Sequence, residues 1–461
     1  MSKPKTLLIN PAYSYGEGNV WKSVGSVMPP LGLAYIGAIL EQHGYPVTVK
    51  DFQADSQGFE NDLNFLLTEK YDFLGFSATT PQINTALKMA RHVKTQRPDV
   101  VVIFGGVHPS VMSDEVLANE TVSLVVRGEG EQTMLEIVSG KPWAEISGMS
   151  YKENDKIIHN PNRPLVENLD DLPDPAYHLL PVEKYHPTTG AYKQLPAISV
   201  LATRGCPSVC TYCHRQLGKK IRTRSGKRVA AEVKRLHDNY GIKEICFYDD
   251  TFTINKNEVY SFIEELKSYK LPITYVCFSR VDSVDYPLLK AMHDSGCHQI
   301  CFGVESTNKQ ILRNIKKGIS MEMVTRAVKD TQKAGIEARI ALMIGNPGET
   351  EETVMDSVSF AIKLEPDLVI FNVTTPYPGT EMFKWADENG CLITKDWDLY
   401  DLKHQVMNLP TLSSKEINKL YTKAYRKFYF RPRYVLKHLL KMRTKNDVMN
   451  AFNGLRAVLK I

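Results

Sequence analysis

The chain has 461 residues with a formal net charge of +5, and 43% of its residues are hydrophobic and 24% charged. At roughly 150 residues per domain this length predicts about three domains, and the composition excludes a disordered, collagen-like or coiled-coil chain. The sequence contains no run of about 18 apolar residues, so no membrane-spanning helix is expected. The first residues lack the apolar stretch of a signal peptide, and we therefore expect a cytoplasmic protein.

Residues 1–140 alternate short apolar runs with segments of helical period. The apolar runs predict strands at residues 6–9, 47–51, 73–77, 100–104 and 122–126. The segments of helical period lie at residues 30–43, 60–70, 83–95, 111–119 and 131–139. Because each connection is long enough for a helix, the strands should run parallel. We expect an α/β domain with a doubly wound, Rossmann-like sheet of flavodoxin type, whose ligand crevice lies beyond the carboxyl ends of the strands.

Loop-forming residues follow several of these strands, where such a ligand would be bound. Glycine pairs such as Gly105-Gly106 let the backbone approach a flat or bulky ligand closely. No GxGxxG motif opens the first helix, so a nicotinamide or flavin dinucleotide is not expected.

The remainder of the chain divides into three predicted parts. Proline is frequent in residues 141–195, which we expect to be a linker. Residues 196–390 return to strand–helix alternation. The six predicted strands there lie at residues 197–202, 244–248, 274–278, 299–303, 338–344 and 368–373. Six such units predict a (β/α)6 partial TIM barrel, and residues 391–461 are predicted to be a basic, helical C-terminal region.

The eight cysteines all lie after residue 205, and three of them form a tight group, Cys206, Cys210 and Cys213. A secreted disulfide scaffold would be small and rich in cysteine throughout, so reduced thiols and a metal centre are expected. Three thiolates at this spacing can hold three irons of a [4Fe–4S] cluster and leave the fourth iron open for chemistry. Structural zinc is the alternative, and it would need a fourth ligand such as His214. The other five cysteines are expected to be buried hydrophobic residues.

The loop from Cys206 to Cys213 resembles the CxxxCxΦC signature of the radical SAM superfamily, with Tyr212 at the aromatic position. This resemblance implies that S-adenosylmethionine chelates the open iron and that its reductive cleavage gives a 5′-deoxyadenosyl radical. The enzyme would contribute binding and orientation of the cofactors. Polar residues at the ends of the barrel strands match the family positions that contact S-adenosylmethionine. The implied contact residues are Tyr212, Asp249, Asp250, Arg280, Glu305, Ser306 and Gly345.

The domain ahead of the barrel resembles the cobalamin-binding (B12-binding) class of that superfamily, in residues 28–35, 105–109 and 128–131. The resemblance implies contacts to cobalamin from the strand-end loops. These candidates are Ser77, Thr79, Gly105, Gly106, His108, Gly128 and Glu129. The DxHxxG motif that supplies a histidine to cobalt is absent, as it commonly is in the radical SAM members. The lack of cysteine before residue 206 argues against a methylthiotransferase domain with a second cluster.

The combined resemblance implies a cobalamin-dependent radical SAM enzyme. Its expected reaction is methylation of an unactivated carbon or a phosphinate phosphorus by way of methylcobalamin. Three alternatives stay open: a cobalamin-dependent cyclase or oxidoreductase that transfers no methyl group, a radical SAM enzyme without cobalamin, and an iron–sulfur electron carrier or zinc-binding interaction protein.

The expected partners are a small-molecule or lipid-like substrate and an electron donor such as flavodoxin or ferredoxin. Residues 415–460 contain 13 Lys and Arg against two acids, a density that permits peripheral contact with anionic lipid. A helical cap on the barrel is the alternative interpretation of this tail. Nucleic acid is not expected, because the rest of the chain is not basic.

Overall fold

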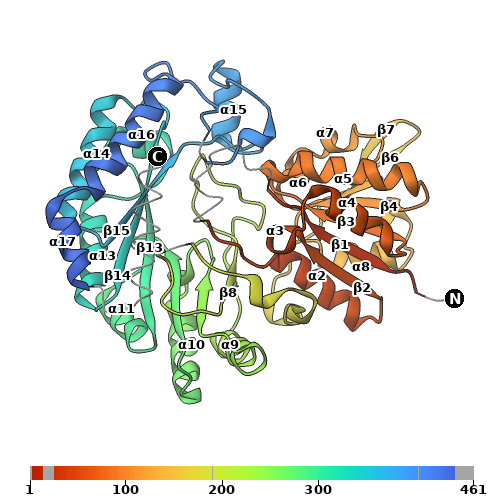
Figure 1. Ribbon diagram of the computed structural model, residues 1–461, viewed down its shortest axis with the longest axis horizontal. Helices are drawn as coiled ribbons and strands as arrows, with labels where there is room; N and C mark the ends of the chain where they lie inside the picture. The colour runs from red at the N-terminus through yellow and green to blue at the C-terminus, as the bar shows by residue number, and fades with distance from the viewer. Residues whose placement is uncertain (1–2, 14–24, 189, 403, 442–461) are drawn as a thin grey trace.

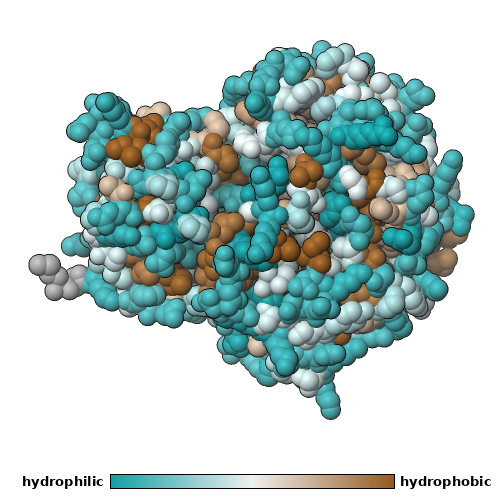
Figure 2. All heavy atoms as spheres, turned by 180° about the vertical axis from the view of Figure 1, so that it is seen from behind, coloured by the Kyte–Doolittle hydropathy of each residue, from teal (hydrophilic) through white to brown (hydrophobic). Residues whose placement is uncertain are grey.

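The computed structural model describes residues 3–13, 25–188, 190–402 and 404–441. It contains two α/β units, one built on the sheet β1–β7 and one on a curved sheet of six strands that begins at β8 (Figure 1). Seen from behind, hydrophobic residues gather in the middle of the molecule, where the two units meet, and the surrounding surface is mostly hydrophilic (Figure 2).

The first unit has the predicted parallel, doubly wound sheet. Its strands run in the order β2-β1-β3-β4-β5, which is the flavodoxin-type order, and each pairs in parallel with its neighbour. The strand bounds are β1 Thr6–Asn10, β2 Val47–Asp51, β3 Phe73–Ser77, β4 Val101–Gly105 and β5 Leu124–Val126. The main helices are α2 Leu31–Gln42, α4 Phe59–Thr68, α5 Ile83–Gln96 and α8 Glu131–Val138. The predicted helix at 111–119 is two short helices, α6 Val107–Val111 and α7 Ser113–Leu117.

The first sheet continues into the segment expected to be a linker. Strands β6 Met149–Glu153 and β7 Lys156–His159 form an antiparallel hairpin, and β6 pairs with β5. Asn154 and Asp155 make its turn with φ angles of 48° and 60°, which these two residue types tolerate better than most. The linker therefore begins after the hairpin, near residue 160.

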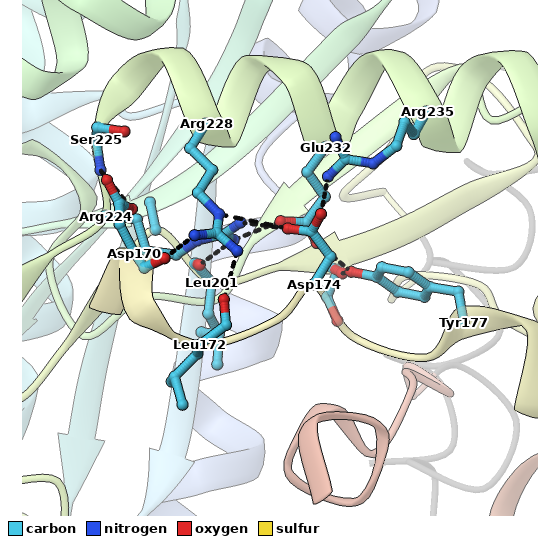
Figure 3. A network of polar contacts seen from close by, with 12 residues as sticks. Asp170, Leu172, Asp174, Tyr177, Leu201, Arg224, Ser225, Arg228, Glu232 and Arg235 are labelled. Atoms are coloured by element: carbon cyan, nitrogen blue, oxygen red, sulfur yellow. Dashed lines mark hydrogen bonds and ion pairs between the residues drawn. The ribbon is translucent and has the colours of Figure 1, made fainter. Parts of the chain in front are cut away.

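The linker lies against helix α9, Gly226–Tyr240, through a dense set of polar contacts (Figure 3). Arg228 donates to the backbone oxygens of Asp170 and Leu172, and Arg235 pairs with Asp174. Tyr177 donates to Glu232, with 2.7 Å between the oxygens. These contacts fix the linker on the barrel.

The second unit is the predicted partial barrel, six parallel strands in the order β15-β14-β13-β12-β11-β8. Their bounds are β8 Ala197–Val200, β11 Glu244–Phe247, β12 Thr274–Ser279, β13 Cys297–Glu305, β14 Glu337–Ile344 and β15 Leu368–Val373. The helices on the outer face include α9, α10 Lys256–Tyr269, α11 Tyr286–His293, α13 Met321–Lys333 and α14 Glu351–Leu364. Strands β8 and β15 are the two edges of this sheet, so the barrel is open between them.

Helix α16, Ser414–Tyr429, covers the β15 edge of the barrel. The hydroxyl of Tyr425 accepts from Phe371 N (3.3 Å) and donates to Phe371 O (3.1 Å). Tyr429 makes the same pair of bonds with Val369, at 3.2 and 2.6 Å. An edge strand exposes unpaired backbone groups, and here side chains satisfy them. Most of the described part of the basic tail is therefore a cap on the barrel; residues 442–461 lie outside the described residues.

No helix among the described residues is long and apolar enough to cross a membrane.

Candidate active site

The cysteine loop follows strand β8 and the short strand β9, Thr203–Arg204, at the carboxyl end of the barrel. Gly205 sets its course with a φ of +88°, where a Cβ atom would lie only 2.5 Å from the Lys220 carbonyl oxygen. The backbone N–H of Cys206 donates to Gly218 O (3.2 Å), and that of Cys213 to Cys210 O (3.3 Å). All three cysteines are free thiols.

Among the described residues, no three His, Cys, Asp or Glu side chains converge closely enough to form a finished metal site. The donor set nevertheless suits an iron–sulfur cluster, since three free thiols share one loop and two cations lie nearby. Burial lowers the pKa of Lys317, but Glu305 and then the Cys210 thiol outweigh it, so the pKa is raised. Burial lowers the pKa of Arg280, but its bonds with Asp282, helped by charge on Cys210 and Cys206, raise the pKa overall.

Glu305, Lys317 and Tyr212 form one polar group beside the cysteine loop. Lys317 Nζ lies 3.0 Å from both the Glu305 Oε1 and the Tyr212 hydroxyl, which itself donates to Glu305 at 3.2 Å. Glu305 has a φ of +70° at a bulge in β13. Gly303 leaves room for the Glu305 and Lys317 side chains, because a Cβ atom at this position would lie 2.4 Å from Glu305 Oε1. Sequence reasoning missed Lys317, which lies in a loop with no motif of its own.

Asp249 and Asp250 have opposite placements, although they are adjacent. Asp249 is buried, and its Oδ1 accepts from Ala202 N (2.9 Å) and from the backbone N and hydroxyl of Thr203. It therefore fixes the chain just ahead of the cysteine loop, and its predicted contact with S-adenosylmethionine stays a prediction. Asp250 lines the cavity described below. Burial raises the pKa of both carboxyls, that of Asp249 to about 7.

The other expected contact residues in the barrel have local structural partners. Arg280 holds Asp282 with two bonds of 2.9 and 2.7 Å. Ser306 is buried and accepts from Asn308 N at 3.3 Å, a turn contact. Gly345, with a φ of +100°, donates its N–H to the buried carboxylate of Glu349 at 2.7 Å. Their predicted contacts to S-adenosylmethionine stay predictions.

A cavity of about 380 Å³ lies between the two units. The first unit lines it with the carboxyl ends of β1, β3, β4 and β5 and the start of α2. The barrel lines it with Leu201, Asp250 and the residues on either side of the cysteine loop, Arg204-Gly205 and His214 to Gly218. Glycine is frequent in its wall. The lining glycines are Gly32, Gly75, Gly105, Gly106, Gly128, Gly130, Gly205 and Gly218. At Gly32 and Gly128 a Cβ atom would meet nothing within 4 Å. This backbone-lined, mainly apolar space suits a large, flat ligand such as a corrin.

Four of the predicted cobalamin contacts, Ser77, Gly105, Gly106 and Gly128, line this cavity. Three others do not. Thr79 begins the short helix of residues 80–82, with its hydroxyl bonded to Gln82 at 2.7 Å. His108 is fully buried against Trp397, and its Nδ1 lies 3.3 Å from the Thr80 hydroxyl, so it packs two remote parts of the chain together. Its predicted contact with cobalamin stays a prediction.

Glu129, the third predicted cobalamin contact that does not line the cavity, belongs to a buried group of charges that joins the two units. Its carboxylate accepts from Arg204 (3.0 Å) and Arg222 (2.9 Å), and Arg204 also donates to Glu131 at 2.7 Å. The Arg204 guanidinium also lies over the ring of Tyr35, 4.9 Å from its centre. Sequence reasoning missed both arginines, because their partners lie far away in the chain.

Comparison with known proteins agrees with the division of the chain into two α/β units. The model of the radical SAM superfamily matches residues 200–361, and that of the B12 binding domain matches residues 20–138. An uncharacterized methyltransferase of Pyrococcus horikoshii, PH0819, is 37% identical over 96% of both chains. The anaerobic magnesium-protoporphyrin IX monomethyl ester cyclase of Rubrivivax gelatinosus is 26% identical over 92% of this chain and 77% of its own. The fold is similar to that of the cobalamin-dependent S-adenosylmethionine radical enzyme OxsB, with a TM-score of 0.76 and 16% sequence identity. The match covers 99% of this chain and 71% of the OxsB chain.

The fold and the site thus define a radical SAM enzyme with a cobalamin-binding domain. The chain belongs to the family of cobalamin-binding radical SAM enzymes, whose cofactors are a [4Fe–4S] cluster, S-adenosylmethionine and cobalamin. The predicted fold class, cofactors and enzyme class are confirmed.

Proposed function

We propose that this protein transfers a methyl group from S-adenosylmethionine, by way of cobalamin, to an unreactive carbon or phosphorus of a small molecule. One observation carries the proposal. A single cavity is lined on one side by the strand ends of the B12-binding domain and on the other by the residues that flank the cysteine loop, Arg204-Gly205 before it and His214 to Gly218 after it. A substrate in this space would lie between the cobalamin-binding strand ends and the chain next to the cysteine loop. The identity to a methyltransferase over 96% of the chain supports the choice of reaction.

When bound, the cluster and S-adenosylmethionine supply a hydrogen-abstracting radical, and cobalamin supplies the methyl group. The residues of the chain itself bind these cofactors and orient them toward the substrate. Cys206, Cys210 and Cys213 hold the cluster. The Lys317 cation, paired with Glu305, is placed to receive the carboxylate end of S-adenosylmethionine. The apolar wall and glycines of the cavity keep water away from the radical.

The reaction is tested with protein that has been reconstituted anaerobically with iron, sulfide and hydroxocobalamin and then freed of unbound ligand. We expect about one cobalt per chain, and both S-adenosylhomocysteine and 5′-deoxyadenosine after reduction. Cys213→Ala should abolish 5′-deoxyadenosine, whereas Cys391→Ala, a buried thiol outside the loop, should not. Cobalt and 5′-deoxyadenosine without S-adenosylhomocysteine would reject the methyltransferase in favour of a cyclase or oxidoreductase.

We also propose that flavodoxin or ferredoxin delivers the electron in the cytoplasm, and that helix α17, Pro432–Lys441, touches anionic lipid. In support of the second point, Leu436 and Leu440 are 58% and 70% exposed on a helix that also bears Arg433 and Lys437. Sedimentation with phosphatidylglycerol vesicles tests it: the wild-type chain should bind and a Leu436→Asp, Leu440→Asp variant should not.

A further inference from the structure

The strand registers place five residues in one layer of the barrel. Val200 pairs with Phe247, and Phe247 with Cys277, so the next residues, Leu201, Tyr248 and Phe278, are level. Phe278 pairs with Cys301, and Cys301 with Arg339. Leu201 also lines the cavity between the two units. One end of the layer, at Leu201, therefore lies at the space in which the substrate is proposed to bind.

Arg339 points into the barrel. Its neighbours on β14, Ala338 and Ile340, belong to the hydrophobic core on the outer face of the sheet, and successive residues of a strand face opposite sides. The charge of Arg339 also acts on side chains of other strands. Burial raises the pKa of Tyr248 to about 12 and also raises that of Cys301, and in both cases Arg339 opposes the rise. Strand β11, which leads to Tyr248, is three strands away in the sheet, so both side chains must face the interior.

Arg339 has no ion pair or hydrogen bond within the described part of the chain, and its Nε is buried without a partner. The acid on the same face of β14, Glu337, accepts from Gln299 at 3.3 Å. By contrast, the buried Arg204, Arg222 and Arg224 are each paired with glutamate. A partly buried cation without a counter-ion is costly, and a binding site is the usual reason to keep one.

The rest of the layer is apolar and aromatic. Tyr248 and Phe278 stack with their ring centres 5.2 Å apart, and Cys301 is buried beside the arginine. We infer that Arg339 binds a carboxylate, phosphate or phosphonate group of the substrate, while the aromatic pair contacts its apolar part. This inference rests on the proposed function and adds to it that the substrate is an anion.

The test uses the reconstituted protein with its cluster reduced, because a paramagnetic cluster broadens the NMR signals of nuclei bound near it. The probes are methylphosphonate, followed by its phosphorus signal, and carboxyl-labelled acetate, followed by its carbon signal. At least one should broaden with the wild-type protein. Arg339→Met should weaken this binding about tenfold or more, as expected for loss of a charge-assisted hydrogen bond. Arg339→Lys should retain part of it.

Arg326→Met, which removes an exposed arginine from α13, is the matched control and should bind the probes as wild type does. Broadening of methylphosphonate alone would assign a phosphonate or phosphate, and broadening of acetate alone a carboxylate. Broadening of neither, or equal broadening with Arg339→Met, would overturn the inference. Formation of 5′-deoxyadenosine and S-adenosylhomocysteine by wild type is measured in parallel, so failure of the proposed reaction is seen separately from failure of anion binding.

Discussion

Arg204 of the barrel and Glu129 of the first unit form a buried ion pair, with Nη1 3.0 Å from Oε1. Both side chains are less than 10% exposed, and Arg222 donates to the same carboxylate. Arg204 lies two residues before Cys206. The pair therefore ties the start of the cysteine loop directly to the domain proposed to hold cobalamin.

Glu129→Gln should destabilise the protein strongly, because it leaves Arg204 and Arg222 with less counter-charge in a buried place. Breaking one partner of a buried ion pair costs about 3–5 kcal/mol. Urea unfolding of the full chain should show this loss in the free energy of unfolding. Glu145→Gln, at an exposed position of the same unit, should change it little. A wild-type stability for Glu129→Gln would mean that the pair does not hold the units together.

Gly205→Ala should prevent assembly of the cluster. The added Cβ would lie 2.5 Å from Lys220 O and 2.9 Å from Leu217 O, so the loop must move. Iron and sulfide per chain after reconstitution should fall well below the wild-type content. Gly241→Ala is the matched control, since its φ of +65° is also positive but nothing lies within 4 Å of the added atom. It should cost about 1 kcal/mol of stability and leave iron content unchanged. Full iron content in Gly205→Ala would contradict the described loop.

Asp249→Asn should reduce the pH dependence of stability. Burial raises the pKa of this carboxyl to about 7, so between pH of about 4 and 7 the folded state holds a proton that the unfolded chain has lost. Its favourable contribution is complete below about pH 4 and disappears as the pH rises to about 7. Asparagine is neutral throughout, and its oxygen can accept the same bonds from Ala202 and Thr203.

The measurement for Asp249→Asn is urea unfolding at a series of pH values. The variant should lose stability less steeply than wild type from pH of about 4 to 7. Asp155→Asn, in the exposed hairpin turn, should follow the wild-type curve. Parallel curves for Asp249→Asn and wild type would show that Asp249 is ionised in the folded protein.

Replacing Tyr425 and Tyr429 by phenylalanine should loosen the open edge of the barrel. Each change leaves a backbone N–H and C=O of β15 without a partner, at a cost of about 1–3 kcal/mol. Amide exchange at Val369 and Phe371 should speed up, and the melting temperature should fall. Tyr260→Phe, on α10, should change neither, because the Tyr260 hydroxyl makes no hydrogen bond within the described residues. Unchanged exchange in the double variant would mean that the two hydroxyls do not protect the edge.

The elements that sequence reasoning predicted well are those set by local pattern. All five strands of the first parallel sheet and all six of the barrel occur within a few residues of their predicted places, because hydrophobic runs and turn residues act locally. The cysteine loop was found for the same reason, since its spacing is contained in eight residues.

The features that were missed depend on contacts between distant residues. Arg204 and Glu129 are 75 positions apart, and Tyr425 and Phe371 are 54 apart, so no local pattern reports either pair. Asp249 and Ser306 were predicted to contact a ligand, and the structure adds bonds to backbone groups that the sequence does not reveal, because strand-end polar residues can serve either role. The burial of His108 was not predicted, because the segment that covers it, that of Trp397, is remote in the sequence.

The central claim is that cobalamin lies in the cavity between the two units, facing the cysteine loop. Gly32 lines this cavity, its φ is not positive, and an added Cβ atom would meet nothing within 4 Å, so Gly32→Trp can enter the cavity without straining the backbone. The decisive measurement is cobalt per chain after reconstitution, with 5′-deoxyadenosine formation measured on the same sample. We predict that Gly32→Trp loses cobalt but still forms 5′-deoxyadenosine, and that Gly32→Ala retains both. Cobalt at the wild-type level in Gly32→Trp would contradict the account.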